Sequence, residues 1–166
     1  MKIPRKMFQE GIELCKKNVL DYLNEAEMMA QKGSLHHAYV SVQLAIEETG
    51  KALWLKDELQ KNPNDPVNVP DVVFGINGNK SHKLKFERAS KVLNQDMLWV
   101  CKGPFDRDIF NPRVFNVSRE ASPETRLLNA YVKFDEKAQK WYIGCDIDSS
   151  ILNALIKNIE KVVSTL

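Results

Sequence analysis

The sequence predicts a mainly α-helical fold: an antiparallel bundle of helices with a small β-hairpin before the last one. Four stretches repeat apolar side chains every three or four positions, which is the spacing of one buried helical face. The region 131–143 instead alternates apolar and polar side chains, as half-buried strands do. Successive helices of this kind pack antiparallel by default. The 166 residues are enough for a single domain, over 1–166, with a core of its own.

The first helix is expected from Pro4 to the residue before Gly33. Proline suits the first turn of a helix, because its missing N–H would have no partner there. Gly33 suits the C-terminal end and Ser34 the N-terminal cap of the next helix, so the first two helices should form a tight hairpin. The apolar stripe of the first helix is Phe8, Ile12, Cys15, Val19, Tyr22, Leu23, Ala26 and Met29.

The second helix is expected from Leu35 to Gln60. It is apolar on more than one side, which is typical of the central helix of a bundle. Its middle is nevertheless charged, because residues 45–52 read A-I-E-E-T-G-K-A. Charged side chains among apolar neighbours must find partners or stay in water. Glu47 and Lys51 lie one turn apart in the favourable acid-before-base order, whereas Glu48 points to another side.

The third helix is expected over residues 81–101. It follows an irregular stretch over 62–80, whose first part contains three prolines that forbid regular structure. The apolar face of this helix begins at its N-terminal end with His82 and Lys85, while Lys83 points away. The third helix therefore offers cations to the charged middle of the second.

The last part of the chain combines a loop, a hairpin and a helix. Residues 103–122 are irregular, and Ser122-Pro123-Glu124 is a helix-start signal. Residues 131–135 and 140–143 predict the two strands of the hairpin. Asp148 suits the N-terminal cap of the last helix. The apolar face of that helix carries Ile151, Leu155, Ile159 and Val162.

Composition and charge argue against several classes of protein. The formal net charge is +2, from 24 basic and 22 acidic side chains, which disfavours a dedicated electrostatic nucleic-acid binder. No run of about 18 apolar residues occurs, so we expect no membrane-spanning helix and no membrane partner. Cys15, Cys101 and Cys145 form no C-x-x-C pair, so neither a metal site nor a redox motif is expected, and no cofactor. Free thiols of this kind fit a reducing, cytoplasmic environment.

Several features, in sequence order, resemble one family. They are Ala38-Tyr39, E-E-x-G-K-A at 47–52, H-K-x-K at 82–85, Arg126, Ala130-Tyr131-Val132, Asp135 and Trp141. From about Ala26 onward, the chain resembles the AbiV-type abortive-infection proteins, a branch of the HEPN helical superfamily. The two charged motifs together carry most of this resemblance.

The resemblance implies a prokaryotic, cytosolic anti-phage protein that halts phage production after infection, at the level of RNA or translation. It also implies a homodimer, since HEPN proteins often dimerise. Many HEPN proteins are metal-independent endoribonucleases with an Arg-x(4–6)-His motif, whose histidine handles protons at the RNA 2′-hydroxyl while the arginine steadies the phosphate. This chain departs from that motif, because none of His36, His37 and His82 has an arginine at that spacing. Lys83 or Lys85 could replace it, although lysine lacks the bidentate fork.

Glu47, Lys51, His82 and Lys85 are expected to form a polar cluster between the second and third helices. In a catalytic interpretation, His82 is a general acid or base, Lys85 holds a phosphate, and Glu47 orients the histidine or the lysine. In a structural interpretation, the cluster is a buried ion-pair network that fixes the helix register. The candidate binding residues are Lys51, Glu48, Lys83 and Arg126.

Other candidate sites carry less specific patterns. His36 and His37 face different ways on a helix, so no metal site is expected from them. The hairpin aromatics Tyr131, Trp141 and Tyr142 could stack on a base or seal the edge of the core. A further group mixes cations and aromatics. It could be a surface for single-stranded RNA, which often has this composition, or a loop that contacts another protein. Its members are Arg107, Arg113, Arg119, Arg126, Phe105, Phe110 and Phe115.

Three functions are compatible with the sequence. The first is a phage-defence protein that acts in the cytosol by binding RNA, the translation machinery or a phage protein. The second is a metal-independent endoribonuclease toxin, with His82 as acid or base and Lys85 or Lys51 as the phosphate cation. The third is a helical protein-interaction module in which the polar cluster is purely structural.

Overall fold

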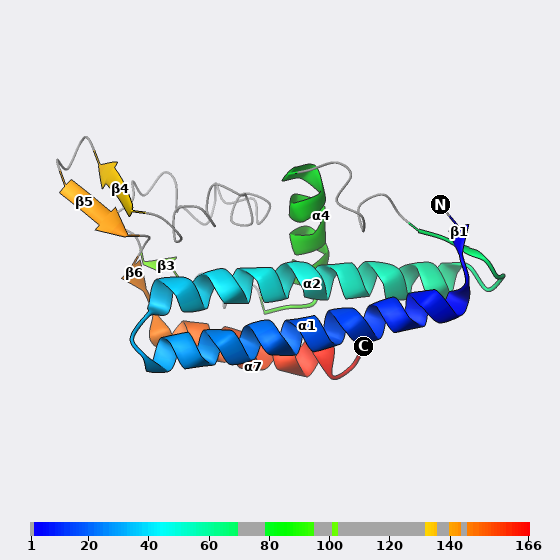
Figure 1. Ribbon diagram of the computed structural model, residues 1–166, viewed down its shortest axis with the longest axis horizontal. Coiled ribbons are helices and arrows are strands. Elements are labelled where there is room, and N and C mark those ends of the chain that lie inside the picture. The colour runs from blue at the N-terminus through cyan, green and yellow to red at the C-terminus, as the bar shows by residue number, and fades with distance from the viewer. Residues whose placement is uncertain (1, 70–78, 95–100, 103–131, 136–139, 144–145) are drawn as a thin grey trace.

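The computed structural model describes residues 2–69, 79–94, 101–102, 132–135, 140–143 and 146–166 (Figure 1). Its helices are α1 (Arg5–Gln31), α2 (Leu35–Lys61), α4 (Asn79–Ser90) and α7 (Ser149–Val163). Short strands, each paired with one other strand, accompany these helices. The mainly helical fold that the sequence predicts is confirmed.

The hairpin of α1 and α2 runs along the length of the structure (Figure 1). Gly33 turns the chain with φ of 77°, a conformation that glycine adopts without steric cost. The N–H of Gly33 donates to the carbonyl of Ala30 and the N–H of Ser34 to that of Met29, both at 2.9 Å, which closes α1 in a Schellman arrangement. Ser34 is the N-cap residue of α2, but its hydroxyl lies 2.8 Å from Nδ1 of His37 and makes no capping bond.

The remaining helices pack on this hairpin in different ways. α7 lies along it and contacts both α1 and α2, whereas α4 stands across α2 (Figure 1). As predicted, Asp148 caps α7, because its Oδ1 accepts from the N–H of Ser150 (2.9 Å) and of Ile151 (3.2 Å). The steep crossing of α4 brings a short segment of it close to the middle of α2.

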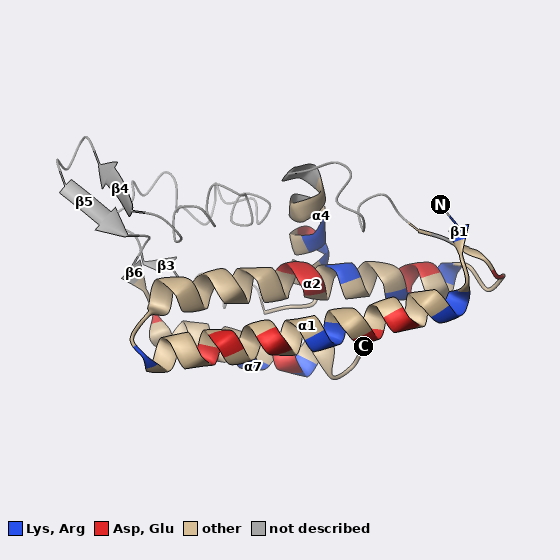
Figure 2. Cartoon of the chain, in the orientation of Figure 1, with Lys and Arg blue, Asp and Glu red and all other residues tan. Residues whose placement is uncertain are grey.

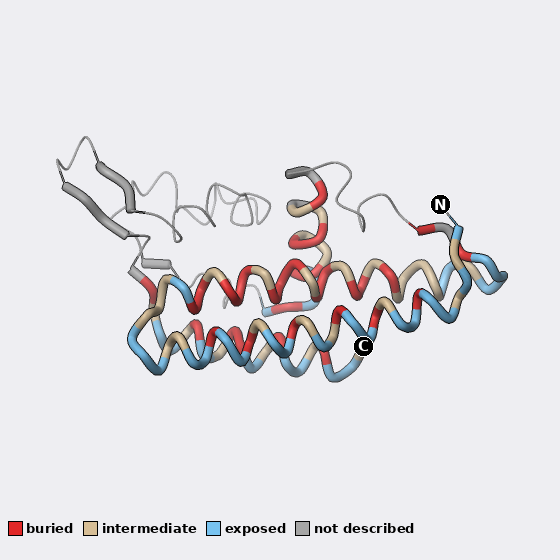
Figure 3. The backbone as a smooth tube through the Cα atoms, viewed as in Figure 1, coloured by how far each residue is buried: buried red, intermediate tan, exposed pale blue. Residues whose placement is uncertain are grey.

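The core consists of two clusters of buried apolar side chains. The larger cluster joins α1, α2, α4 and α7, and Ile46 is its last member on α2. The smaller cluster lies near the other end of the hairpin, and Ala52 is its first member on α2. Figure 3 shows the buried side of α2 continuing through the interval between them. Residues 47–51, which carry the charges, therefore lie between two apolar cores.

The strands form three antiparallel pairs. β1 (Lys2–Ile3) pairs with β2 (Val67–Asn68), and β3 (Cys101–Lys102) pairs with β6 (Asp146–Ile147). β4 (Val132–Asp135) pairs with β5 (Lys140–Ile143), so the hairpin that the sequence predicts before the last helix is present.

The third helix is shorter than the sequence predicts. The expectation of a helix to Cys101 is wrong, because α4 ends at Ser90 and Cys101 belongs to β3. After α4, the N–H of Asn94 donates to Oδ1 of Asn158 in α7 (2.9 Å), and Leu93 is buried in the larger cluster. Contacts with α7 therefore override the helical pattern of the local sequence.

We expected the prolines of residues 62–70 to exclude all regular structure, and this expectation is wrong. Val67–Asn68 form β2 because β1 supplies a partner strand. The predicted loop at 103–122 and the helix start at 122–124 lie outside the described residues. In the part of the chain that the structure describes, no helix combines the length and apolar character needed to cross a membrane.

Candidate functional site

The charged middle of α2 sends carboxylates toward two different helices. Glu47 faces α4 and is buried, whereas Glu48 lies on the side of α1 and is partly exposed. Consecutive residues of a helix differ by about 100° around its axis, which explains the division. We use the term polar cluster for Glu47, Glu48, Lys51, His82 and Lys85.

Gly50 sets the depth at which α4 docks on α2. A Cβ atom at this position would lie 1.8 Å from the carbonyl oxygen of Lys85 and 2.6 Å from its carbonyl carbon. Only glycine allows a backbone to approach a helix this closely. The glycine of the E-E-x-G-K-A motif therefore brings the start of α4, with His82 and Lys85, within reach of the charges on α2.

His82 and Glu47 form the tightest contact of the polar cluster. Nδ1 of His82 lies 2.5 Å from Oε2 of Glu47. The Glu47 side chain is 9% exposed and that of His82 is 34% exposed, so the carboxylate is buried while the imidazole reaches the surface. A buried carboxylate on Nδ1 fixes the orientation of the ring and favours a proton on that nitrogen.

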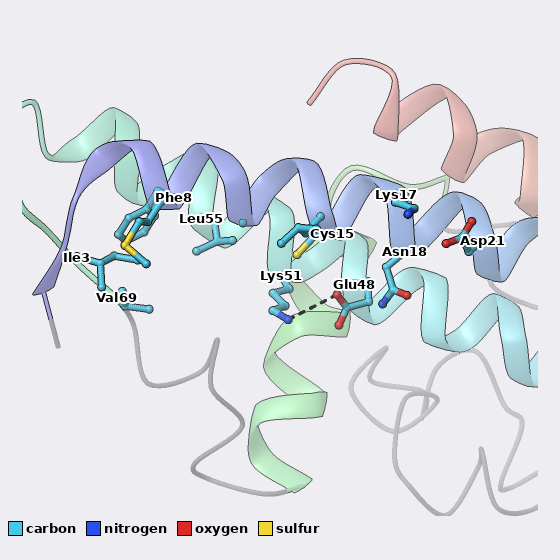
Figure 4. A pocket seen from close by; sticks show the side chains of 13 residues that line it. Ile3, Phe8, Cys15, Lys17, Asn18, Asp21, Glu48, Lys51, Leu55 and Val69 are labelled. Carbon is cyan, nitrogen blue, oxygen red and sulfur yellow. Dashed lines mark ion pairs between the residues drawn. The ribbon is translucent and has the colours of Figure 1, made fainter.

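Glu48, rather than Glu47, is the ion-pair partner of Lys51. The distance from Lys51 Nζ to Glu48 Oε2 is 3.6 Å, and both side chains are partly exposed (Figure 4). The expected pairing of Glu47 with Lys51 is therefore wrong, whereas Glu48 does point to another side than Glu47, as the sequence predicts. The physical reason is that the contact with His82 directs Glu47 to α4, which leaves Lys51 to the carboxylate one turn away on the α1 side.

Lys85 is buried between these charges. Its exposed fraction is 8%, and no carboxylate among the described residues forms an ion pair with its Nζ. Burial lowers the pKa of Lys85 below its ordinary value and the positive charge of Lys51 lowers it further, while the carboxylates of Glu48 and Glu47 partly oppose this shift. Lys85 and Lys51 are thus two neighbouring cations, and each one disfavours the charged form of the other.

Cys15 of α1 completes this region, and the sequence analysis assigned it no role beyond a buried thiol. Burial, with a contribution from Glu48, raises the pKa of Cys15 to about 11. The thiol is free, buried and held in its neutral, unreactive form. The only sequence signal for its location is its position on the apolar stripe of α1.

A bidentate ion pair holds the far end of α4 on α2. Arg88 Nε lies 2.8 Å from Asp57 Oδ2, and its Nη2 lies 2.9 Å from Oδ1. Paired N–H···O bonds of this kind fix geometry as well as adding stability. Gly50 and Arg88 together therefore determine where α4 lies, and no sequence pattern predicts this role for either residue.

A groove of about 510 Å³ lies between α1 and α2 beside the polar cluster (Figure 4). One end is apolar and includes Phe8 and Leu55. The other end is polar and includes Cys15, Glu48 and Lys51. The α1 side of the cluster is therefore open to a partner, whereas Glu47 and Lys85 on the α4 side are buried.

The structure brings together five of the seven predicted site residues: Glu47, Glu48, Lys51, His82 and Lys85. Arg126 lies outside the described residues, as does Tyr131, and the side chain of Lys83 is likewise not described. His36 and His37 lie at the start of α2, away from the cluster. No group of three metal-ligating side chains occurs in the described ranges.

This arrangement offers two kinds of chemistry. A surface imidazole held by a buried carboxylate can accept or donate a proton at its other nitrogen. Two neighbouring ammonium groups favour an anion such as a phosphate. An antiparallel helical hairpin with this charged segment at its centre agrees with the HEPN class of helical proteins.

Comparison with known families supports a specific member of this class. The sequence profile of the AbiV family of HEPN proteins matches residues 7–153. Because the match covers most of the chain, the protein belongs to the AbiV family, whose role is abortive infection, a defence against phage. Neither the curated proteins nor the solved structures contain a match.

Proposed function

We propose that this AbiV-family protein defends the cell as a cytosolic homodimer that binds RNA, the translation machinery or a phage protein through the polar cluster. The observation that carries the proposal is Lys85, a buried cation beside Lys51 with no ion pair to the described carboxylates. A buried ammonium group beside a second cation is costly, so a phosphate that approaches the cluster would gain from the attraction of both cations. Phosphates of RNA, free or within the translation machinery, fit this requirement best.

RNA binding by the purified protein tests this proposal. Lys85→Met removes the charge but keeps an unbranched side chain of similar length, so we expect weaker binding by a folded protein. Lys61→Met is the matched control, because Lys61 lies at the end of α2, is exposed and pairs with Glu58 away from the cluster. Equal affinity of the parent and Lys85→Met for RNA would contradict the proposal.

The Glu47–His82 contact favours a second candidate function, a metal-independent endoribonuclease. The 2.5 Å contact gives His82 the oriented imidazole that general acid–base catalysis needs. Total cellular RNA, incubated with the protein without added metal, would then be cut at discrete positions, and the His82→Ala variant would leave it intact. If the parent cuts nothing, or if a folded His82→Ala variant cuts equally well, His82 is not a catalytic residue.

A further inference from the structure

The outward side of α1 carries large apolar side chains that nothing in the described structure covers. Met7 is 51% exposed and Leu14 is 67% exposed. They are seven residues apart and therefore lie on one face of the helix. We call this face, with the charged residues around it, the outer ridge: Lys6, Met7, Glu10, Leu14, Lys17 and Asp21.

Leu14 borders two hollows of the surface. The groove of about 510 Å³ between α1 and α2 includes Leu14 in its wall. A second hollow of about 650 Å³ lies over the ridge itself, and its lining includes Glu10, Leu14 and Lys17. A projecting side chain beside such hollows can pack against another helix, because ridges of one helix fit into the grooves of the next.

The charges of the outer ridge alternate in sign along the helix. From the N-terminal end they are Lys6, Glu10, Lys17 and Asp21, all of them exposed. Figure 2 shows that both signs of charge occur along α1. When such a series is reversed and laid against itself, every cation meets an anion, whereas a parallel copy would place like charges together. The outer ridge is therefore complementary to its own antiparallel copy.

We infer that a second copy of this chain docks on the outer ridge, with the two α1 helices antiparallel across a twofold axis near Leu14. Lys17 then faces Glu10 of the partner subunit, and Asp21 faces Lys6 of the partner subunit. A contact of this kind is isologous, since the same patch serves both subunits. Leu14 of each subunit enters a hollow beside Leu14 of the other.

The outer ridge lies next to the polar cluster. The groove that ends at Glu48 and Lys51 has Leu14 in its wall, so the partner subunit would lie at the edge of this groove. The inference rests on the homodimer of the proposed function and specifies the surface through which it forms.

Sedimentation equilibrium of the purified full chain tests the surface. Leu14→Asp places a charge at the centre of the contact, and we expect it to raise the dimer dissociation constant by about a hundredfold or more. Leu20→Asp is the matched control, because Leu20 is an exposed leucine on α1 that lies off the ridge, and this change should leave the constant unaltered. Circular dichroism verifies that each variant retains its helices.

Charge reversal provides the second arm of the experiment. Glu10→Lys and Lys17→Glu should each weaken the dimer by about tenfold, because each places like charges opposite one another. The double variant exchanges the two signs and should return the constant to within about threefold of the parent.

The outcomes separate the two proposals. A parent chain that is monomeric at every concentration overturns both the homodimer and the docking surface. A dimer that withstands Leu14→Asp and both charge reversals overturns the outer ridge as the contact, while the homodimer of the proposed function stands.

Discussion

Gly50 is the residue on which the junction of α2 and α4 depends most directly. The backbone of Lys85 occupies the space where a side chain at position 50 would begin. A glycine inside a helix costs about 1 kcal/mol relative to alanine, so its presence here needs a compensating contact. That contact is the docking of α4, which supplies His82 and Lys85 to the cluster.

Gly50→Ala should therefore destabilise the protein. We expect a loss of about 1–3 kcal/mol in the free energy of unfolding, because α4 must move away from α2. Denaturant unfolding measures it, and Gly11→Ala is the control, since a Cβ there would lie 3.4 Å from Leu55 Cδ1, an ordinary contact. If Gly50→Ala is as stable as Gly11→Ala, the close approach of α4 is not a requirement of the fold.

The buried charge of Lys85 leads to a prediction about pH. The pKa of Lys85 is lowered in the folded protein, so between that value and the ordinary 10.5 the unfolded chain holds more protons than the folded one. The cost of burying the charge is thus fully present below the lowered pKa and is relieved as pH rises from there toward 10.5. We expect Lys85→Met to be at least as stable as the parent near pH 7, with its advantage shrinking toward pH 10.5.

Urea unfolding of both proteins across this pH range measures that difference. A stability difference that stays constant or grows with pH would show that the fold does not disfavour the charged form of Lys85. Because the comparison is between two proteins at each pH, the titration of other groups, including Cys15, cancels to first order.

At the scale of elements, the helix ends differ in how they are held. Asp148 accepts two backbone N–H groups at the start of α7, whereas Ser34 at the start of α2 makes no capping bond. Asp148→Ala should cost about 0.5–2 kcal/mol, which is typical for the loss of a cap. Ser34→Ala should cost less, and thermal unfolding compares the two. Equal losses would mean that the Asp148 bonds add nothing beyond the preference for a helix start.

The sequence predicts those helix boundaries that are set by a residue at the boundary itself. The α1–α2 turn follows from Gly33, and the start of α7 follows from Asp148, so these boundaries agree with the structure. The end of α4 does not, because Asn94 and Leu93 are fixed by contacts with α7 and the larger core cluster. β1 and β2 escaped prediction for the same reason, since each two-residue strand exists only through its partner.

At the scale of the whole molecule, the candidate site is a polar interval between two apolar cores. Its membership could be predicted from two charged motifs, since Glu47, Lys51, His82 and Lys85 do meet at the junction. The pairing of charges within the cluster could not be predicted, because the orientation of α4 on α2 decides which carboxylate each cation reaches. Cys15 of α1 lies beside Glu48 and Lys51 because of how α1 packs on α2, and no sequence motif predicts this position.

The central claim is that the polar cluster carries the defence expected of an AbiV-family protein. The most direct measurement is the plating efficiency of phage on cells that produce the parent chain, Lys51→Met, Lys85→Met or the control Lys61→Met, at equal levels of folded protein. We expect the parent and Lys61→Met to suppress plaques, and the two cluster variants to allow plating as in cells without the protein. Full protection by both cluster variants would contradict it.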